Sequence, residues 1–164
     1  MKSRIAGIVN DSIVDGPGIR CTIFFQGCTH NCEECHNKHT HDLNGGYVVD
    51  NIDILKKVEE NPLLDGITFS GGEPLLQIES CIEIAKEVKK MGLDVVCYTG
   101  FVYEDALKIK GFDELKKYID ILIDGKYMKD LRDLSLRYRG SQNQRLIDMK
   151  KTILENKVVL MNID

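Results

Sequence analysis

Short β-branched and aromatic segments alternate with helical segments along this chain, and this alternation restricts the folds open to it more than any other feature. Strands are expected in five segments, which are residues 20–26, 66–70, 93–99, 118–124 and 158–163. Strands that alternate with helices form a parallel sheet through crossover connections. A closed eight-unit barrel needs about 250 residues, but the chain has only 164. The sequence therefore predicts an α/β fold in a single domain, residues 1–164, built as an open partial (βα) barrel or a short doubly wound sheet.

Two helices carry clear start and stop signals. Asp50 is suited to cap the first helix, which should end before Asn61 and Pro62. The second helix should open near Gln77 and end at Gly92. Its apolar residues recur at three- and four-residue spacing, at Ile78, Cys81, Ile82, Ala85 and Val88.

Charge and hydropathy argue against two classes of partner. Lys and Arg number 22 and Asp and Glu number 26, so the net charge is −4 and there is no overall basic field to hold nucleic acid. No apolar run reaches the roughly 18 residues that cross a bilayer, and the first residues lack the apolar stretch of a secretory signal. We therefore expect a cytoplasmic protein with neither nucleic acid nor a membrane as its partner.

Residues 27–46 are predicted to form a long functional loop that contains three closely spaced cysteines. Cys28, Cys32 and Cys35 lie within eight residues. In a reducing cytosol such thiols are expected to be ligands, because thiolates suit zinc and iron–sulfur clusters. Three thiolates on a four-iron cluster would leave one iron open to a substrate or cofactor.

A zinc site is the alternative for the same loop. A Cys3His site would stabilise a binding module without catalysis, and its fourth ligand would be one of four loop histidines, His30, His36, His39 or His41. The other three cysteines are expected to pack in strands and on a helix; they are Cys21, Cys81 and Cys97.

A glycine pair follows the second predicted strand. Gly71 and Gly72 stand before Glu73 and Pro74. Without Cβ atoms, their backbone could touch a ligand that side chains would keep away, although a tight turn would use the same residues. The spacing fits neither a dinucleotide fingerprint nor a phosphate loop, which argues against NAD or ATP. Reactive groups should gather at the carboxyl ends of the strands, where both motifs lie.

Together, C-x3-C-x2-C after the first strand and Ser-Gly-Gly-Glu-Pro after the second resemble the radical S-adenosylmethionine (radical SAM) enzymes. Flanking strings make the chain similar to the activating proteins of glycyl-radical enzymes; they are residues 15–20, 25–28, 36–37, 71–75, 124–126 and 139–145. The short length and residues 139–145 match the branch that activates anaerobic ribonucleoside-triphosphate reductase. The resemblance spans residues 5–148 and implies the open partial (βα) barrel of radical SAM enzymes.

The resemblance implies a reaction and its cofactors. One [4Fe-4S] cluster per chain binds the amino and carboxylate groups of S-adenosyl-L-methionine (SAM), and one electron cleaves the sulfonium C–S bond. The resulting 5′-deoxyadenosyl radical takes a hydrogen atom from one glycine of the reductase large subunit. A flavodoxin or ferredoxin supplies the electron. The same likeness would allow pyruvate formate-lyase as the partner, but residues 139–145 argue against that relative.

The resemblance also assigns roles to residues. Cys28, Cys32 and Cys35 would hold the cluster. Gly71, Gly72 and Glu73 would present backbone and carboxylate to the SAM amino group, with Pro74 fixing the turn.

Other residues take weaker roles by resemblance. The adenine side of the SAM pocket would be lined by Glu34, Cys35 and His36. In the wider superfamily the residue before the third cysteine is often aromatic, whereas this chain has Glu34 there. Asp124 is a candidate for SAM or ion contact, with a turn aspartate as the alternative. No protein side chain is expected to act as a catalytic acid or base, because the cluster and SAM carry the reactive atoms.

Overall fold

The computed structural model describes residues 1–30 and 38–162. Within these residues, seven strands form one sheet in the order β3-β1-β2-β4-β5-β6-β7. Their bounds are β1 Lys2–Ser12, β2 Arg20–Phe25, β3 Tyr47–Asp50, β4 Gly66–Gly71, β5 Asp94–Tyr98, β6 Ile121–Asp124 and β7 Arg145–Asp148. The α/β class and the open sheet are confirmed, while the single domain over residues 1–164 stays a prediction.

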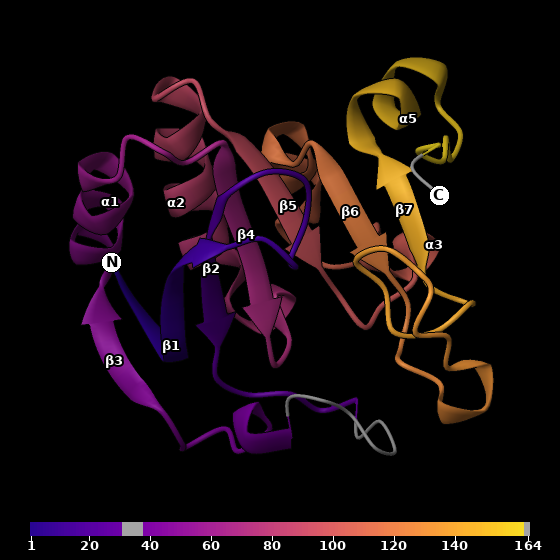
Figure 1. Cartoon of the computed structure of the whole chain (residues 1–164), viewed down its shortest axis with the longest axis horizontal. Coiled ribbons are helices and arrows are strands. Elements are labelled where there is room, and N and C mark those ends of the chain that lie inside the picture. Colours follow the sequence, from indigo (N-terminus) through magenta and orange to yellow (C-terminus); the bar gives the residue numbers. More distant parts are fainter. Residues whose placement is uncertain (31–37, 163–164) are drawn as a thin grey trace.

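The centre of the sheet is parallel, as the alternation predicted. Strands β2, β4, β5 and β6 pair in parallel, and Phe25 lies opposite Gly71 at the last position of the first pair. Figure 1 shows the arrowheads of these four strands pointing to the same side, where the chain directly after β2 and the turn η1 also lie. The carboxyl ends of the strands therefore meet along one edge, as the motif positions required.

Both flanks of the sheet are antiparallel, which the sequence analysis missed. Strand β1 pairs with β2 and β3 on one side, and β7 pairs with β6 on the other. The sequence of residues 2–12 does not stand out as a strand, because serines occupy two of its buried positions, Ser3 and Ser12, and several other side chains are charged or polar. Residues 158–163 were expected to form the last strand, but their described part contributes only the bridge between Leu160 and Ile147.

The helices with capping signals lie where they were predicted. Helix α1 spans Asn51–Glu60 and its cap, Asp50, accepts a hydrogen bond from the Ile52 amide. Helix α2 spans Ile78–Lys90 and is followed by Gly92 in a left-handed conformation. The remaining helices are short, namely α3 Tyr103–Ala106, α4 Phe112–Leu115 and α5 Met149–Glu155, with 3-10 turns η1 Lys38–Thr40, η2 Pro74–Gln77, η3 Lys116–Tyr118 and η4 Lys129–Leu131. None of the helices in the described residues has the length and apolar character that a membrane span requires.

The two faces of the sheet bury different amounts of apolar surface. The larger core joins one face of the sheet to the helices, and it includes Phe25, Phe69 and the α2 residues Cys81, Ile84 and Val88. A smaller cluster on the other side comprises Val96, Ile121, Ile123 and Leu146, with Tyr98 and Tyr138 packed against it. The helix-covered face holds the sheet rigid, whereas the less covered face leaves room for a cavity.

Candidate functional site

A cavity of about 820 Å³ lies at the carboxyl ends of the parallel strands. Each of these strands, or the residue directly after it, contributes to the wall, through Phe24, Ser70, Tyr98 and Gly125. Further parts of the wall come from β1 and the β1–β2 loop, from the cysteine loop through Cys28 and His41, and from the segment 126–144. The volume lies within the range of small-molecule sites.

The cysteine loop is closed at its base, which places Cys28 at the cavity. The Gly27 amide donates to the Thr40 carbonyl at 2.5 Å, and the Cys28 amide donates to the His41 carbonyl at 3.2 Å. The side-chain amide of Gln26 donates to the His39 and Asp42 carbonyls. Cys28 is half-buried and borders the cavity.

Four other site predictions fall within residues 31–37 and lie outside the described residues; they are Cys32, Glu34, Cys35 and His36. Among the described residues, no group of three Cys, His, Asp or Glu side chains forms a metal site. The thiol of Cys28 is a soft ligand of the kind that iron–sulfur clusters use, so the described side of the site fits such a cluster.

The glycine pair borders the cavity, but another backbone already fills the space that a side chain would need. A Cβ on Gly71 would overlap backbone atoms of Phe25, and one on Gly72 would overlap the carbonyl oxygens of Gly27 and Thr40. The Gly72 amide donates to the Phe25 carbonyl at 2.9 Å, and the Glu73 amide donates to the Gly27 carbonyl at 2.7 Å. The glycines thus allow the end of β4 to press against the base of the cysteine loop.

Glu73 is completely buried, and its carboxylate accepts hydrogen bonds from four groups of the protein. The Thr99 hydroxyl lies 3.0 and 2.9 Å from the two oxygens, and the Gly100 amide donates at 2.7 Å. The Leu75 amide and Nε2 of His30 lie at 3.0 and 2.5 Å. Contact between this carboxylate and the SAM amino group stays a prediction, while Pro74 begins the turn η2 as expected.

A buried arginine, Arg20, fixes the β1–β2 loop over the sheet. This contact gives the sequence motif of residues 15–20 a structural role. The guanidinium of Arg20 is fully buried and donates to the Thr68 hydroxyl at 2.8 Å, the Pro17 carbonyl at 2.8 Å and the Ile67 carbonyl at 2.7 Å. It also pairs with Asp94. This part of the cavity wall is therefore tied to β4.

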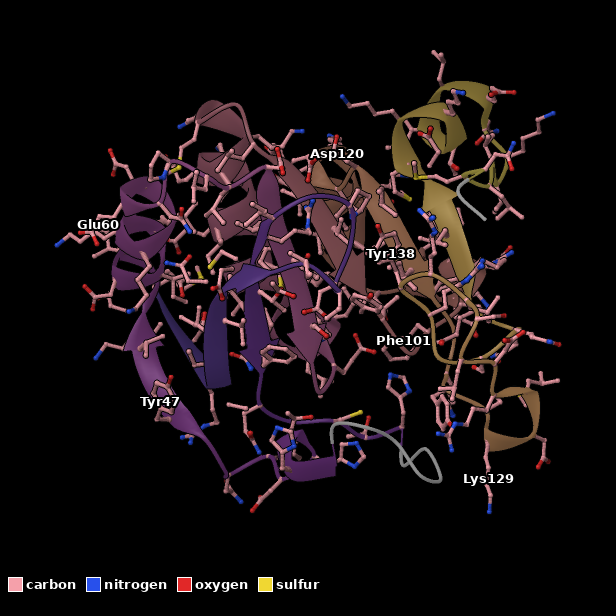
Figure 2. All side chains as sticks on the ribbon, in the orientation of Figure 1. Tyr47, Glu60, Phe101, Asp120, Lys129 and Tyr138 are labelled. Atoms are coloured by element: carbon pink, nitrogen blue, oxygen red, sulfur yellow. The ribbon has the colours of Figure 1, made fainter. Side chains whose placement is uncertain are left out.

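A tyrosine pair holds the opposite wall. The Tyr98 hydroxyl donates to the Tyr138 carbonyl at 2.6 Å, and burial raises the pKa of this phenol, which keeps it a donor. Tyr138, labelled in Figure 2, adopts a left-handed backbone conformation with φ of 62° within the wall segment. Tyr98 and Thr99 could have been predicted as site residues from their place at the carboxyl end of β5. The same rule, that ligands bind at the carboxyl ends of strands, selected the cysteine loop and the glycine pair.

Asp124 is occupied by structural contacts. Its carboxylate is buried, accepts from the Tyr103 amide at 2.7 Å and pairs with Arg145 at 2.5 Å. Arg145 also pairs with Glu104 at 2.7 Å, and the hydrogen bond from Arg145 lowers the pKa of that carboxyl. Two members of the 139–145 string thus have different surroundings: Arg145 ties β7 to α3, whereas Arg139 borders the cavity.

Several known proteins are similar to this chain in sequence or in structure. The family model of a 4Fe-4S single cluster domain matches residues 14–147. The chain is 35% identical over 142 residues to the anaerobic ribonucleoside-triphosphate reductase-activating protein of Haemophilus influenzae, covering 80% of this chain and 89% of the relative. It is 40% identical over 134 residues to the pyruvate formate-lyase-activating enzyme of Clostridium pasteurianum, covering 77% of this chain and 54% of that relative. The crystal structure of QueE from Escherichia coli matches with a TM-score of 0.49 and 17% identity, over 61% of this chain and 53% of that one.

Proposed function

The chain belongs to the family of anaerobic ribonucleoside-triphosphate reductase-activating proteins, and from this membership we propose that it forms a glycyl radical on the large subunit of such a reductase. It is an enzyme of the radical SAM activase type, with an iron–sulfur cluster and a glycyl-radical enzyme as its partner. One observation carries the finer proposal. Cys28 and the Gly71-Gly72 pair, from motifs more than 40 residues apart, border the same cavity.

A [4Fe-4S] cluster, when bound, supplies the electron that splits SAM into methionine and a 5′-deoxyadenosyl radical, which removes a hydrogen atom from the partner's glycine. Cys28, Cys32 and Cys35 would hold the cluster through three thiolates. The backbone of Gly71 and Gly72 would border SAM, and Glu34, Cys35 and His36 would lie on its adenine side. The proposed electron donor, a flavodoxin or ferredoxin, would place the reaction in the cytoplasm.

The described walls would protect the reaction from water and stray hydrogen donors. The Arg20 contacts hold the β1–β2 loop against the sheet, and the bond from Tyr98 to Tyr138 holds the opposite segment. No proton transfer by a side chain is needed, so the contribution of these residues is position and exclusion. The open side of the cavity would admit the glycine-bearing segment of the partner.

Electron paramagnetic resonance tests the proposal directly. The reconstituted protein, SAM, a reductant and the reductase are mixed without oxygen, and we expect the doublet of a glycyl radical on the reductase. Cys28→Ala should abolish both the doublet and 5′-deoxyadenosine formation because a cluster ligand is lost. Cys81→Ala is the matched control, since this thiol is buried in the core and should cost only about 1 kcal/mol of stability.

Either of two results would contradict the proposal and support another function. A colourless protein with one tightly bound zinc would support the Cys3His binding module instead. A doublet that forms on pyruvate formate-lyase and not on the reductase would support the second candidate, which the 40% identity to the clostridial enzyme favours.

A further inference from the structure

The Glu73 carboxylate connects three separate segments of the chain, which are its own turn before η2, the residues after β5 and the cysteine loop. Glu73 follows β4, and the groups that donate to it come from η2, from the residues after β5 and from the cysteine loop. One oxygen is near His30 and Gly100, the other accepts from the Leu75 amide, and the Thr99 hydroxyl lies within hydrogen-bond distance of both. A carboxylate has about four lone-pair sites. The group is therefore filled by partners from the protein itself.

His30 is the contact from the cysteine loop. It lies two residues after Cys28, and its side chain is only 7% exposed. Its Nε2 atom is 2.5 Å from the Glu73 carboxylate, and its ring stands edge-on to Phe101 with 4.6 Å between the ring centroids. Phe101 is labelled in Figure 2. The imidazole is thus held by a hydrogen bond at one edge and an aromatic ring beside it.

The segment after β5 is shaped to receive this imidazole. A Cβ on Gly100 would overlap three atoms of the His30 ring, so this position requires glycine. Three consecutive residues, Thr99, Gly100 and Phe101, therefore bond to Glu73 or pack against His30. Shape, hydrogen bonding and ring packing all point to the same pairing.

We propose that His30 and Glu73 form a buried clamp that positions the cysteine loop on the ends of β4 and β5. In this role Glu73 is a positioning residue for the cysteine loop. Only the expected effect of the clamp on SAM binding rests on the proposed function. The pairing itself is a property of the metal-free chain.

Breaking the clamp should leave buried groups without partners. Removal of the imidazole takes a donor from a buried carboxylate and opens space beside Gly100, which loosens the bonds of the Gly100 and Leu75 amides to Glu73. Hydrogen exchange measures such local opening. The loss of one bond to a charged group should accelerate exchange at these two amides about tenfold or more.

The first experiment compares amide hydrogen exchange of the metal-free protein at one pH. In His30→Ala, the Gly100 and Leu75 amides should exchange about tenfold or more faster than in the wild type. His30→Gln should restore part of the protection, because its amide can still donate. The control is His39→Ala, an exposed histidine of the same loop, which should leave both amides unchanged. Unchanged exchange in His30→Ala would overturn the clamp.

A double-mutant cycle tests the pairing itself. The free energies of unfolding of His30→Ala, Glu73→Gln and the double variant should be strongly non-additive, because the second change removes a contact that is already lost. Additive effects would mean that the two side chains act independently, and the clamp would be wrong. If Glu73→Gln does not fold, the exchange comparison on His30 still decides.

A SAM titration separates the clamp from the proposed function. In the reconstituted, reduced protein, the SAM concentration that half-changes the cluster's paramagnetic spectrum should rise about tenfold in His30→Ala and less in His30→Gln. An unchanged titration midpoint in His30→Ala would overturn the effect on SAM. If SAM does not alter the spectrum even in the wild type, the proposed function fails, and the exchange result still judges the clamp.

Discussion

At the scale of single residues, the four cysteines that the structure describes divide by their surroundings. Cys21, Cys81 and Cys97 are fully buried, and burial raises the pKa of Cys21 to about 11 and the pKa of the other two well above its usual value. Cys28 is half-buried and borders the cavity. The sequence analysis assigned the first three to packing from strand and helix periodicity alone, and their burial confirms this.

This division predicts a pattern of alkylation. Because the thiolate is the reactive form, Cys21 with a pKa of about 11 stays protonated at about pH 8 and should become reactive only as the pH approaches that pKa. In reduced, metal-free protein, iodoacetamide should therefore modify Cys28, Cys32 and Cys35 first. Mass spectrometry of the digested protein identifies the modified sites.

Two controls complete the alkylation experiment. Denatured protein should be modified at all six cysteines, and protein reconstituted with iron and sulfide should be protected in the loop. If Cys81 or Cys97 reacted as fast as Cys28 in the native protein, their assignment to the core would be wrong.

At the scale of elements, the end of β4 and the base of the cysteine loop depend on a close backbone contact. Gly72→Ala would put a Cβ against the carbonyl oxygens of Gly27 and Thr40, which cannot rotate away as a side chain could. We expect a loss of about 2 kcal/mol, or about 4–8 °C in Tm, as for other overpacked sites. Calorimetry of the metal-free protein measures this change.

Gly7 provides the matched control for this contact. It lies in β1, where an added Cβ would meet no atom within 4 Å, and its φ is not in the left-handed region. Gly7→Ala should therefore change stability by less than about 1 kcal/mol. Equal Tm values for Gly72→Ala and Gly7→Ala would show that the loop base can move aside.

Sequence periodicity predicted the buried elements better than the edges of the sheet. The parallel strands are buried on both faces, as in β4, which is buried over residues 66–70. Strands β1 and β3 have a partly exposed face, so charged residues such as Lys2 and Asp50 interrupt the apolar pattern. Their pairing depends on partners up to 48 residues away, which a local pattern cannot reveal.

The candidate site was predictable in its location but not in its internal contacts. The rule that ligands bind at the carboxyl ends of strands selected Cys28 and Gly72 correctly as cavity residues. It could not show that the Glu73 carboxylate is buried, because its partners, His30 and Thr99, are 43 and 26 residues distant. Such contacts depend on how three loops pack together.

At the scale of the whole molecule, one side of the cavity is bordered by exposed aliphatic side chains. Ile13 and Val14 of the β1–β2 loop are 70% and 69% exposed, and Leu134 of the opposite wall segment is 81% exposed. All three border the cavity. Under the proposed function the partner's glycine would enter the cavity and its flanking residues would contact this rim, because a hydrogen atom is transferred only over a short distance.

This rim of Ile13, Val14 and Leu134 leads to a prediction. Substitutions in it should slow activation of the partner without slowing SAM cleavage. In the double variant Ile13→Asp, Leu134→Asp, charges replace the apolar contact, and glycyl-radical formation at low reductase concentration should fall about tenfold or more. Formation of 5′-deoxyadenosine without the reductase should change less than about twofold, since no partner contact is involved. Leu154→Asp, at an 85% exposed position on α5, is the control and should preserve both rates. An equal fall in both rates would instead place Ile13 and Leu134 in the SAM site, and no change in either would show that the partner docks on a different surface.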